Sequence, residues 1–117
     1  MATKQEVEAF LMVVRQLLKS GAALLITRPK NEGALLALGM SKQAAVADIG
    51  RLGVADYCAG PEEDRDRAGQ QCWVFGQEVA GVEVYIKLVI EVLDAKRQRL
   101  KILSYHQAER PLSYPLR

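Results

Sequence analysis

The first part of the chain carries hydrophobic residues at helical spacing, whereas the second part alternates hydrophobic and polar residues. Over residues 4–20, apolar side chains recur every three or four positions. This spacing predicts an amphipathic helix that begins at the capping pattern of Thr3 and Glu6. A short apolar run at residues 22–27 predicts an edge strand, closed by Pro29.

Two shorter helices are predicted next. Asn31 is expected to cap a brief helix that ends at Gly39. Ser41 is expected to cap another, which runs from residue 42 to about residue 52 and ends at Gly53. These elements complete a helical half of the chain.

The stretch from residue 54 to residue 70 has no hydrophobic period and contains Gly60, Pro61 and a dense cluster of charges. We therefore predict a loop there, and loops of this length inside small domains are often functional. It separates the helical half (residues 1–53) from a β-rich half (residues 71–117).

The β-rich half is predicted to form three strands. They cover residues 71–77, 82–92 and 99–106, with turns at 80–81 and 94–98. In the middle strand, Val84 and Ile86 point one way and are expected to pack on the helices, while Tyr85 and Lys87 point the other way. The predicted fold class is α+β, with N-terminal helices packed on an antiparallel β-meander.

Length and composition fit one globular domain spanning residues 1–117, with 50% hydrophobic and 26% charged residues. No apolar run approaches the roughly 20 residues that span a bilayer, and no secretory signal is recognisable, so a cytoplasmic location without membrane contact is expected. Cys58 and Cys72 are too few for a disulfide framework and match no zinc spacing, which favours two reduced thiols.

The net charge of +2 is unevenly distributed. From Lys96 to the end, six basic residues stand against one acid, Glu109. Such a surplus suits a phosphate-rich partner, although short basic runs are also common surface features. This stretch includes Arg99 and Lys101.

Tyr85 and Lys87 lie two residues apart on the open face of the predicted sheet, where a phenol and an ammonium could bind or act on a phosphodiester. They could equally be ordinary exposed strand residues. His106 is the only histidine, and imidazole is the natural general acid or base near neutral pH. Alternation places it on the side of Leu100 and Ile102, unless the strand bends.

Arg65 and Arg67 lie among acids, which either pair with them or hold them ready for phosphate contact. Trp73 and Phe75 share one strand face and could stack on RNA bases or belong to the core, and at least one is expected in the core. A glycine-rich nucleotide loop and a cluster of metal ligands are both lacking in the sequence, so neither a cofactor nor a metal is expected.

A series of short motifs runs through the second half of the chain. They are Asp56-Tyr57-Cys58-Ala59-Gly60-Pro61, Asp64-Arg65-Asp66-Arg67, Trp73-Val74-Phe75-Gly76, Gly81-Val82-Glu83-Val84-Tyr85-Ile86-Lys87, and Ser104-Tyr105-His106-Gln107-Ala108-Glu109 with Pro111 and Tyr114-Pro115. In this order they resemble the MqsR-type toxins of bacterial type II toxin–antitoxin modules. The resemblance covers the C-terminal half well and the N-terminal half only in helix order.

The resemblance implies a RelE-like fold and a metal-independent endoribonuclease that cleaves mRNA by attack of a ribose 2′-OH. It also implies a cognate antitoxin as partner, often a zinc-ribbon protein with a helix-turn-helix domain. Tyr85 matches the family pattern, whereas Ala59 and Val74 replace a lysine and a glutamine, and His106 replaces a lysine.

The candidate catalytic residues are His106, Tyr85, Lys87, Arg65 and Arg67, and the candidate RNA-binding residues are Arg99, Lys101 and Trp73. The alternative hypothesis is a non-catalytic module that binds nucleic acid or protein through a basic sheet face.

Overall fold

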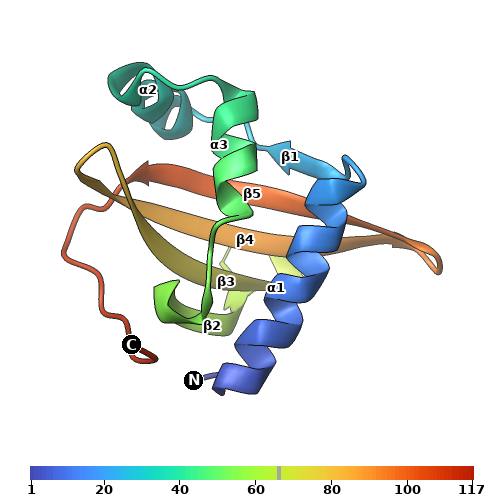
Figure 1. Cartoon of the computed structure of the whole chain (residues 1–117). Coiled ribbons are helices and arrows are strands. Elements are labelled where there is room, and N and C mark those ends of the chain that lie inside the picture. Colours follow the sequence, from blue (N-terminus) through green and yellow to red (C-terminus); the bar gives the residue numbers. More distant parts are fainter. Residues whose placement is uncertain (66) are drawn as a thin grey trace.

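The computed structural model describes residues 1–65 and 67–117, with the side chain at position 67 left out, and this part of the chain forms three α-helices and one five-stranded mixed sheet (Figure 1). The helices are α1 (Lys4–Lys19), α2 (Pro29–Leu38) and α3 (Lys42–Ile49), and a 3-10 turn, η1, covers Val54–Asp56. The strands are β1 (Ala23–Leu25), β2 (Tyr57–Asp64), β3 (Arg67–Val79), β4 (Val82–Asp94) and β5 (Arg97–Gln107). The predicted α+β class is confirmed.

The strands follow the order β1-β5-β4-β3-β2. From β2 to β5, consecutive strands pair antiparallel, which confirms the predicted meander. The short edge strand β1 pairs parallel with β5, so the sheet is mixed rather than wholly antiparallel. Three residues carry too little pattern to reveal strand direction, which here follows from how the intervening helices return the chain to the sheet.

The main core lies between one face of the sheet and helices α1 and α3 (Figure 1). Thr3 and Glu6 form the expected capping box, with each side chain accepting from the other's backbone N–H. This orients α1 so that its apolar stripe meets the sheet. The fully buried side chains of the two layers include Val7, Leu11, Val14, Ile49, Phe75, Val84, Ile86, Leu88, Leu100, Ile102 and Tyr105.

The predicted loop at residues 54–70 is wrong, because most of it forms β2 and the start of β3. The ladder between these strands is irregular, with three register shifts, and this is why the stretch lacks a two-residue period. Pro61 is tolerated because β2 is an edge strand. Gly60, at φ 109°, passes close to the backbone of Cys72, where a side chain would clash.

Two helix boundaries also differ from expectation. The N-cap of α2 is Arg28, with Pro29 as the first helical residue, and not Asn31. Ser41 caps α3 as predicted, but the helix ends at Ile49 with Gly50 as its C-cap. Within the described residues, the helices fall short of the length and apolar character needed to cross a bilayer.

Candidate functional site

The sheet face away from the helices carries most of the residues singled out from the sequence. Cross-strand neighbours share a face, and Tyr85 pairs with His106 while Lys87 pairs with Ser104. Val89 and Leu103 form a small apolar cluster with Cys72 further along this face. The open face therefore combines a polar region with a minor core of its own.

A β-bulge brings His106 onto this face. The β4–β5 register slips at Leu103, because Leu88 pairs with Ile102 but Lys87 pairs with Ser104. The extra residue reverses the alternation of side chains between the two faces of the sheet. His106 therefore lies on the open face, whereas Leu100 and Ile102 lie on the face that packs on the helices. The sequence allows for a bend in this strand. Because the bulge is present, the prediction from regular alternation, which placed His106 on the side of Leu100 and Ile102, is wrong.

Asn31 secures this bulge. Its buried side-chain amide donates to the carbonyl oxygens of Ile26 and Leu103 at 2.9 and 3.2 Å, and its oxygen accepts from the N–H of Tyr105 at 3.0 Å. These bonds satisfy the carbonyl of Leu103 and the N–H of Tyr105, which lie at the bulge, beyond the residues that pair with β1. Asn31 is thus a positioning residue for His106, and sequence reasoning missed it because asparagine before a helix suggests a cap.

The rings of Tyr85 and His106 are stacked, with centroids 5.4 Å apart and 23° between planes. Burial, together with the neighbouring Cys72 and Glu62, raises the pKa of the Tyr85 phenol, so the phenol stays protonated and can donate a hydrogen bond. The Nδ1 atom of His106 lies 3.0 Å from the carbonyl oxygen of Gln107. Because a carbonyl only accepts, Nδ1 carries a proton there and Nε2 is left to exchange one.

Beside Tyr85, β2 and the turn after it form a small hollow of about 420 Å³. Its lining includes Lys87, Arg65 and Glu62. The Nζ atom of Lys87 lies 3.7 Å from Oδ1 of Asp64, whose side chain is only 5% exposed, so the lysine is held at the sheet surface. Arg65 is exposed, and the side chain of the other predicted loop arginine, Arg67, lies outside the described residues.

Two further positions singled out in the sequence, Ala59 and Val74, lie close to Lys87 in the sheet. Ala59 pairs with Val74, and Val74 pairs with Lys87. They form one row across the sheet, next to the row that contains Tyr85 and His106. Five positions from four strands therefore converge on one face, although they are spread from residue 59 to residue 106.

The C-terminal tail borders the other end of this face. The Tyr114 hydroxyl donates to a carboxylate oxygen of Glu83 at 2.8 Å, and the N–H of Leu112 donates to the second oxygen at 3.0 Å. The tail packs directly over Gly76, which pairs with Tyr85 in the sheet. Glycine is needed at this position because any Cβ would meet the tail.

The two cysteines are free, with Cys72 buried and Cys58 half-buried. Burial, reinforced by the Glu83 charge, raises the pKa of Cys58 to about 11, and burial also raises the pKa of Cys72. Both thiols are therefore protonated near neutral pH, and neither is an activated nucleophile.

Both predicted RNA-steering cations on β5 are paired with Glu91, and Arg99 remains partly exposed whereas Lys101 is buried. Glu91 accepts hydrogen bonds from Arg99 Nε at 3.1 Å and from Lys101 Nζ at 3.2 Å. The Lys101 side chain is only 4% exposed, and this burial speaks against the predicted role of Lys101 in steering RNA. Lys101 pairs with Val89 on one side and with Leu24 on the other, and a charge count along the sequence cannot reveal such apolar neighbours.

The side chain of Trp73, which could stack on RNA bases or belong to the core, packs on the helix side of the sheet. It stacks on Phe10 of α1, with ring centroids 4.3 Å apart, and packs against the main core together with Phe75. Both aromatic residues of β3 therefore face the helices, and base stacking by Trp73 on the open face is excluded by this orientation.

Comparisons with protein-family models, curated proteins and solved structures give no match for this chain.

Proposed function

We propose that the chain is an mRNA-cleaving toxin of the MqsR type, with a RelE-like fold, that works on the open face of the sheet. The observation that carries the proposal is the stacked pair of Tyr85 and His106 beside the tethered Lys87. These groups supply a proton donor, a proton acceptor and a cation, which RNA cleavage by 2′-OH attack requires. The resemblance of the C-terminal motifs supplies the substrate class.

In the proposed reaction, the ribose 2′-OH attacks the adjacent phosphorus and the bond to the 5′ oxygen breaks. The products are a 2′,3′-cyclic phosphate and a free 5′-OH. His106 Nε2 takes the proton from the 2′-OH and delivers it to the departing 5′ oxygen, since Nδ1 is engaged with the Gln107 carbonyl. The neutral phenol of Tyr85 donates to a phosphate oxygen, and Lys87 stabilises the charge that develops on the phosphorane. Arg65, at the rim of the hollow, would hold a flanking phosphate.

The charge distribution favours transient over tight binding of RNA. Glu62, Glu63 and Asp64 surround the cations of the hollow, and Glu91 pairs with two further basic side chains. A non-catalytic module with a basic sheet face would need those cations unpaired to hold a phosphate backbone. The enzyme hypothesis needs only brief contact, so we favour it over the binding module.

The test is incubation of the purified protein with a long mRNA in EDTA at fixed ionic strength, followed by mapping of the RNA ends. Discrete cuts with cyclic phosphate and 5′-OH ends are expected. His106→Gln should slow cutting by about 10²–10⁴-fold, the usual contribution of a general acid or base. Lys96→Gln, at an exposed lysine in the β4–β5 turn, is the matched control and should cut normally. Retardation of RNA without cleavage would instead identify a binding module.

A cognate antitoxin, expected to be a zinc-ribbon or helix-turn-helix protein, belongs to the same proposal. A cytoplasmic location follows from it, because mRNA is the substrate.

A further inference from the structure

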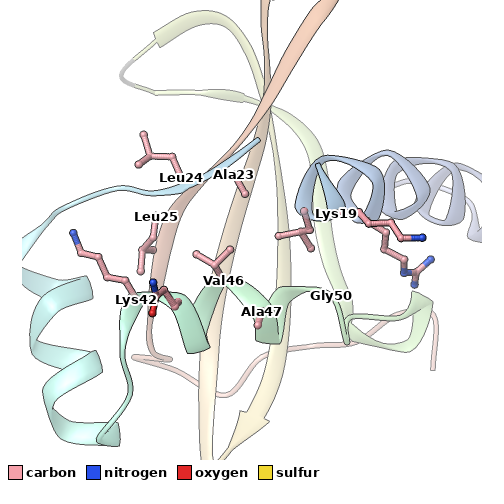
Figure 2. A pocket seen from close by; sticks show the side chains of 11 residues that line it. Lys19, Ala23, Leu24, Leu25, Lys42, Val46, Ala47 and Gly50 are labelled. Atoms are coloured by element: carbon pink, nitrogen blue, oxygen red, sulfur yellow. The ribbon is translucent and has the colours of Figure 1, made fainter. Parts of the chain in front are cut away.

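A groove of about 640 Å³ lies between β1, the end of α1 and helix α3, away from the Tyr85 site (Figure 2). Its floor is apolar, with Leu18 from α1, Ala23 and Leu25 from β1, and Val46 from α3. Figure 2 shows Val46 reaching from α3 toward the strand, and Leu24 on the opposite side of β1 from Leu25.

One edge of β1 opens into this groove. The Ile26 N–H donates to Ile102 at 3.0 Å, and the Leu100 N–H donates to the carbonyl of Ala22 at 2.8 Å. Alternate residues of a strand direct their backbone groups to opposite sides, so those of Ala23 and Leu25 point away from β5. Since β1 is the last strand of the sheet, their N–H and C=O groups are available to an added strand.

Three cations surround the groove, namely Arg15, Lys19 and Lys42. Arg15 donates to the Leu52 carbonyl at 2.9 Å, and Lys42 donates to the Thr27 hydroxyl at 2.8 Å. In the described part of the chain, none of the three forms a salt bridge and no carboxylate lines the groove. The positive charge here is therefore uncompensated, in contrast to the open face.

We propose that this groove binds an extended, acidic segment of a partner protein, which adds to the sheet beside β1. The segment would pair its backbone with Ala23 and Leu25 and place alternate apolar side chains on the floor. Its intervening carboxylates would meet the three cations. An apolar floor beside a free strand edge suits a polypeptide better than RNA. This surface is separate from the Tyr85 site, so its test stands whether or not the protein cleaves RNA.

The probe is a seven-residue peptide that alternates leucine and glutamate, with blocked ends, titrated into the full chain by NMR. The amides of Ala23 and Leu25 should gain protection from exchange, whereas those of Leu24 and Ile26 already bond to β5. A peptide that alternates leucine and lysine should bind at least tenfold more weakly. No binding of the acidic peptide at millimolar concentration, or equal binding of both peptides, would overturn the proposal.

Two variants separate charge from backbone pairing. The double reversal Lys19→Glu with Lys42→Glu should weaken binding about tenfold or more, while the matched reversal Lys4→Glu with Arg110→Glu, on other exposed surfaces, should not. Ala23→Pro removes a backbone N–H that points away from β5, and an edge strand tolerates proline at such a position. Because this N–H would pair with the peptide, the substitution should also weaken binding. Unchanged affinity in the Lys19 and Lys42 variant contradicts the proposal.

Two other occupants are distinguished by the same measurements. A single-stranded oligouridylate that protects the Ala23 and Leu25 amides more strongly than the acidic peptide would identify nucleic acid as the occupant. A dimer of the free chain that Ala23→Pro dissociates would identify a second copy. Either result would overturn the proposal.

Discussion

Two neighbouring residues of β4 have different roles, because Tyr85 belongs to the proposed site and Ile86 belongs to the core. Tyr85 lies half-buried on the open face, where its ring contacts His106, while Ile86 is fully buried against the helices. One residue step along a strand changes the face, so a single substitution can test either property alone. The same alternation was readable from the sequence.

Tyr85→Phe is expected to lower the rate of RNA cleavage and to leave the free energy of unfolding almost unchanged, because only the hydroxyl is lost. Ile86→Ala should cost about 2–5 kcal/mol through the cavity it leaves. Single-turnover cleavage and urea denaturation measure the two effects. A fully active Tyr85→Phe beside an inactive but normally stable Ile86→Ala would mean that the functional face is assigned backwards.

Glu91 should make part of the stability depend on pH. Hydrogen bonds from Arg99 and Lys101 lower the pKa of its carboxyl in the folded protein. A lowered pKa contributes stability that is complete above the ordinary carboxyl range, near about 4.3, and is lost as pH falls through the folded value. Glu91→Gln also leaves the buried Lys101 without its charged acceptor, which costs about 1–3 kcal/mol at pH 7.

The free energies of unfolding of wild type and Glu91→Gln can be measured by urea denaturation at pH 7, 5 and 3. The difference between the two proteins should become smaller as the pH falls. Glu8→Gln removes an exposed helix carboxylate and serves as the control with no such narrowing. A difference that stays constant from pH 7 to pH 3 would show that the Glu91 ion pairs do not stabilise the fold.

At the scale of elements, α2 and β5 act together through the Asn31 side chain. The helix presents the amide, and the strand presents a bulge whose backbone groups the amide satisfies. The arrangement of Tyr85 and His106 therefore depends on a helix that contributes none of the proposed catalytic residues.

Asn31→Ala should destabilise the protein by at least about 1–3 kcal/mol, because buried backbone groups lose their partners. It should also weaken the ring contact between Tyr85 and His106, which NMR can detect as fewer inter-ring contacts. Leu36→Ala, at an 85% exposed position of the same helix, is the control and should change neither property. Intact ring stacking in a destabilised Asn31→Ala would limit Asn31 to a stabilising role.

The C-terminal tail and β3 meet at Gly76. A Cβ there would lie 2.6 Å from Leu112 Cδ1 and 2.9 Å from Tyr114 Cε1, so Gly76→Ala should displace the tail at a cost of about 1–3 kcal/mol. The cost should shrink in a Tyr114→Ala background, which removes part of the clash. Wild type, Gly76→Ala, Tyr114→Ala and the double variant form a double-mutant cycle, and thermal melts of these four proteins provide the measurement.

Gly33→Ala is the matched control for this cycle. It lies in α2, where an added Cβ meets nothing within 4 Å, and it should stabilise the chain by about 0.4–1 kcal/mol. Equal losses for Gly76→Ala with and without Tyr114 would contradict the close packing of the tail.

At the scale of the whole molecule, the hollow beside Tyr85 and the groove at β1 are two surfaces that share no lining residue. The open face carries the proposed chemistry with its cations matched by carboxylates, and the β1 groove carries unmatched cations. Such a division would let a partner bind without occupying the proposed RNA site.

If the proposed function is correct, expression of the chain alone is expected to arrest bacterial growth and shorten mRNA lifetimes, because a small amount of an mRNA-cleaving enzyme would turn over many transcripts. Co-expression of its antitoxin should relieve the arrest. The measurement is growth and transcript half-life after induction from a tight promoter, with His106→Gln as the inactive control. Unchanged growth and transcript lifetimes with folded wild-type protein would reject the toxin proposal.

The sequence alone determined the features that depend on neighbours along the chain. The capping box at Thr3 and Glu6, the amphipathic α1 and the alternation around Tyr85 and Ile86 all follow from local spacing, because a helix or a strand repeats its own geometry. The face that carries Tyr85 and Lys87 could therefore be predicted.

Only the tertiary structure decided which face His106 occupies, how β2 pairs, and that Lys101 is buried. The bulge at Leu103 is held by Asn31, 72 positions earlier, and β2 forms against β3 despite its irregular pattern. Glu91 pairs with Lys101 because the β4 and β5 register brings them together. Contacts between distant segments set these features, and a local hydrophobic pattern contains no record of which segments will meet.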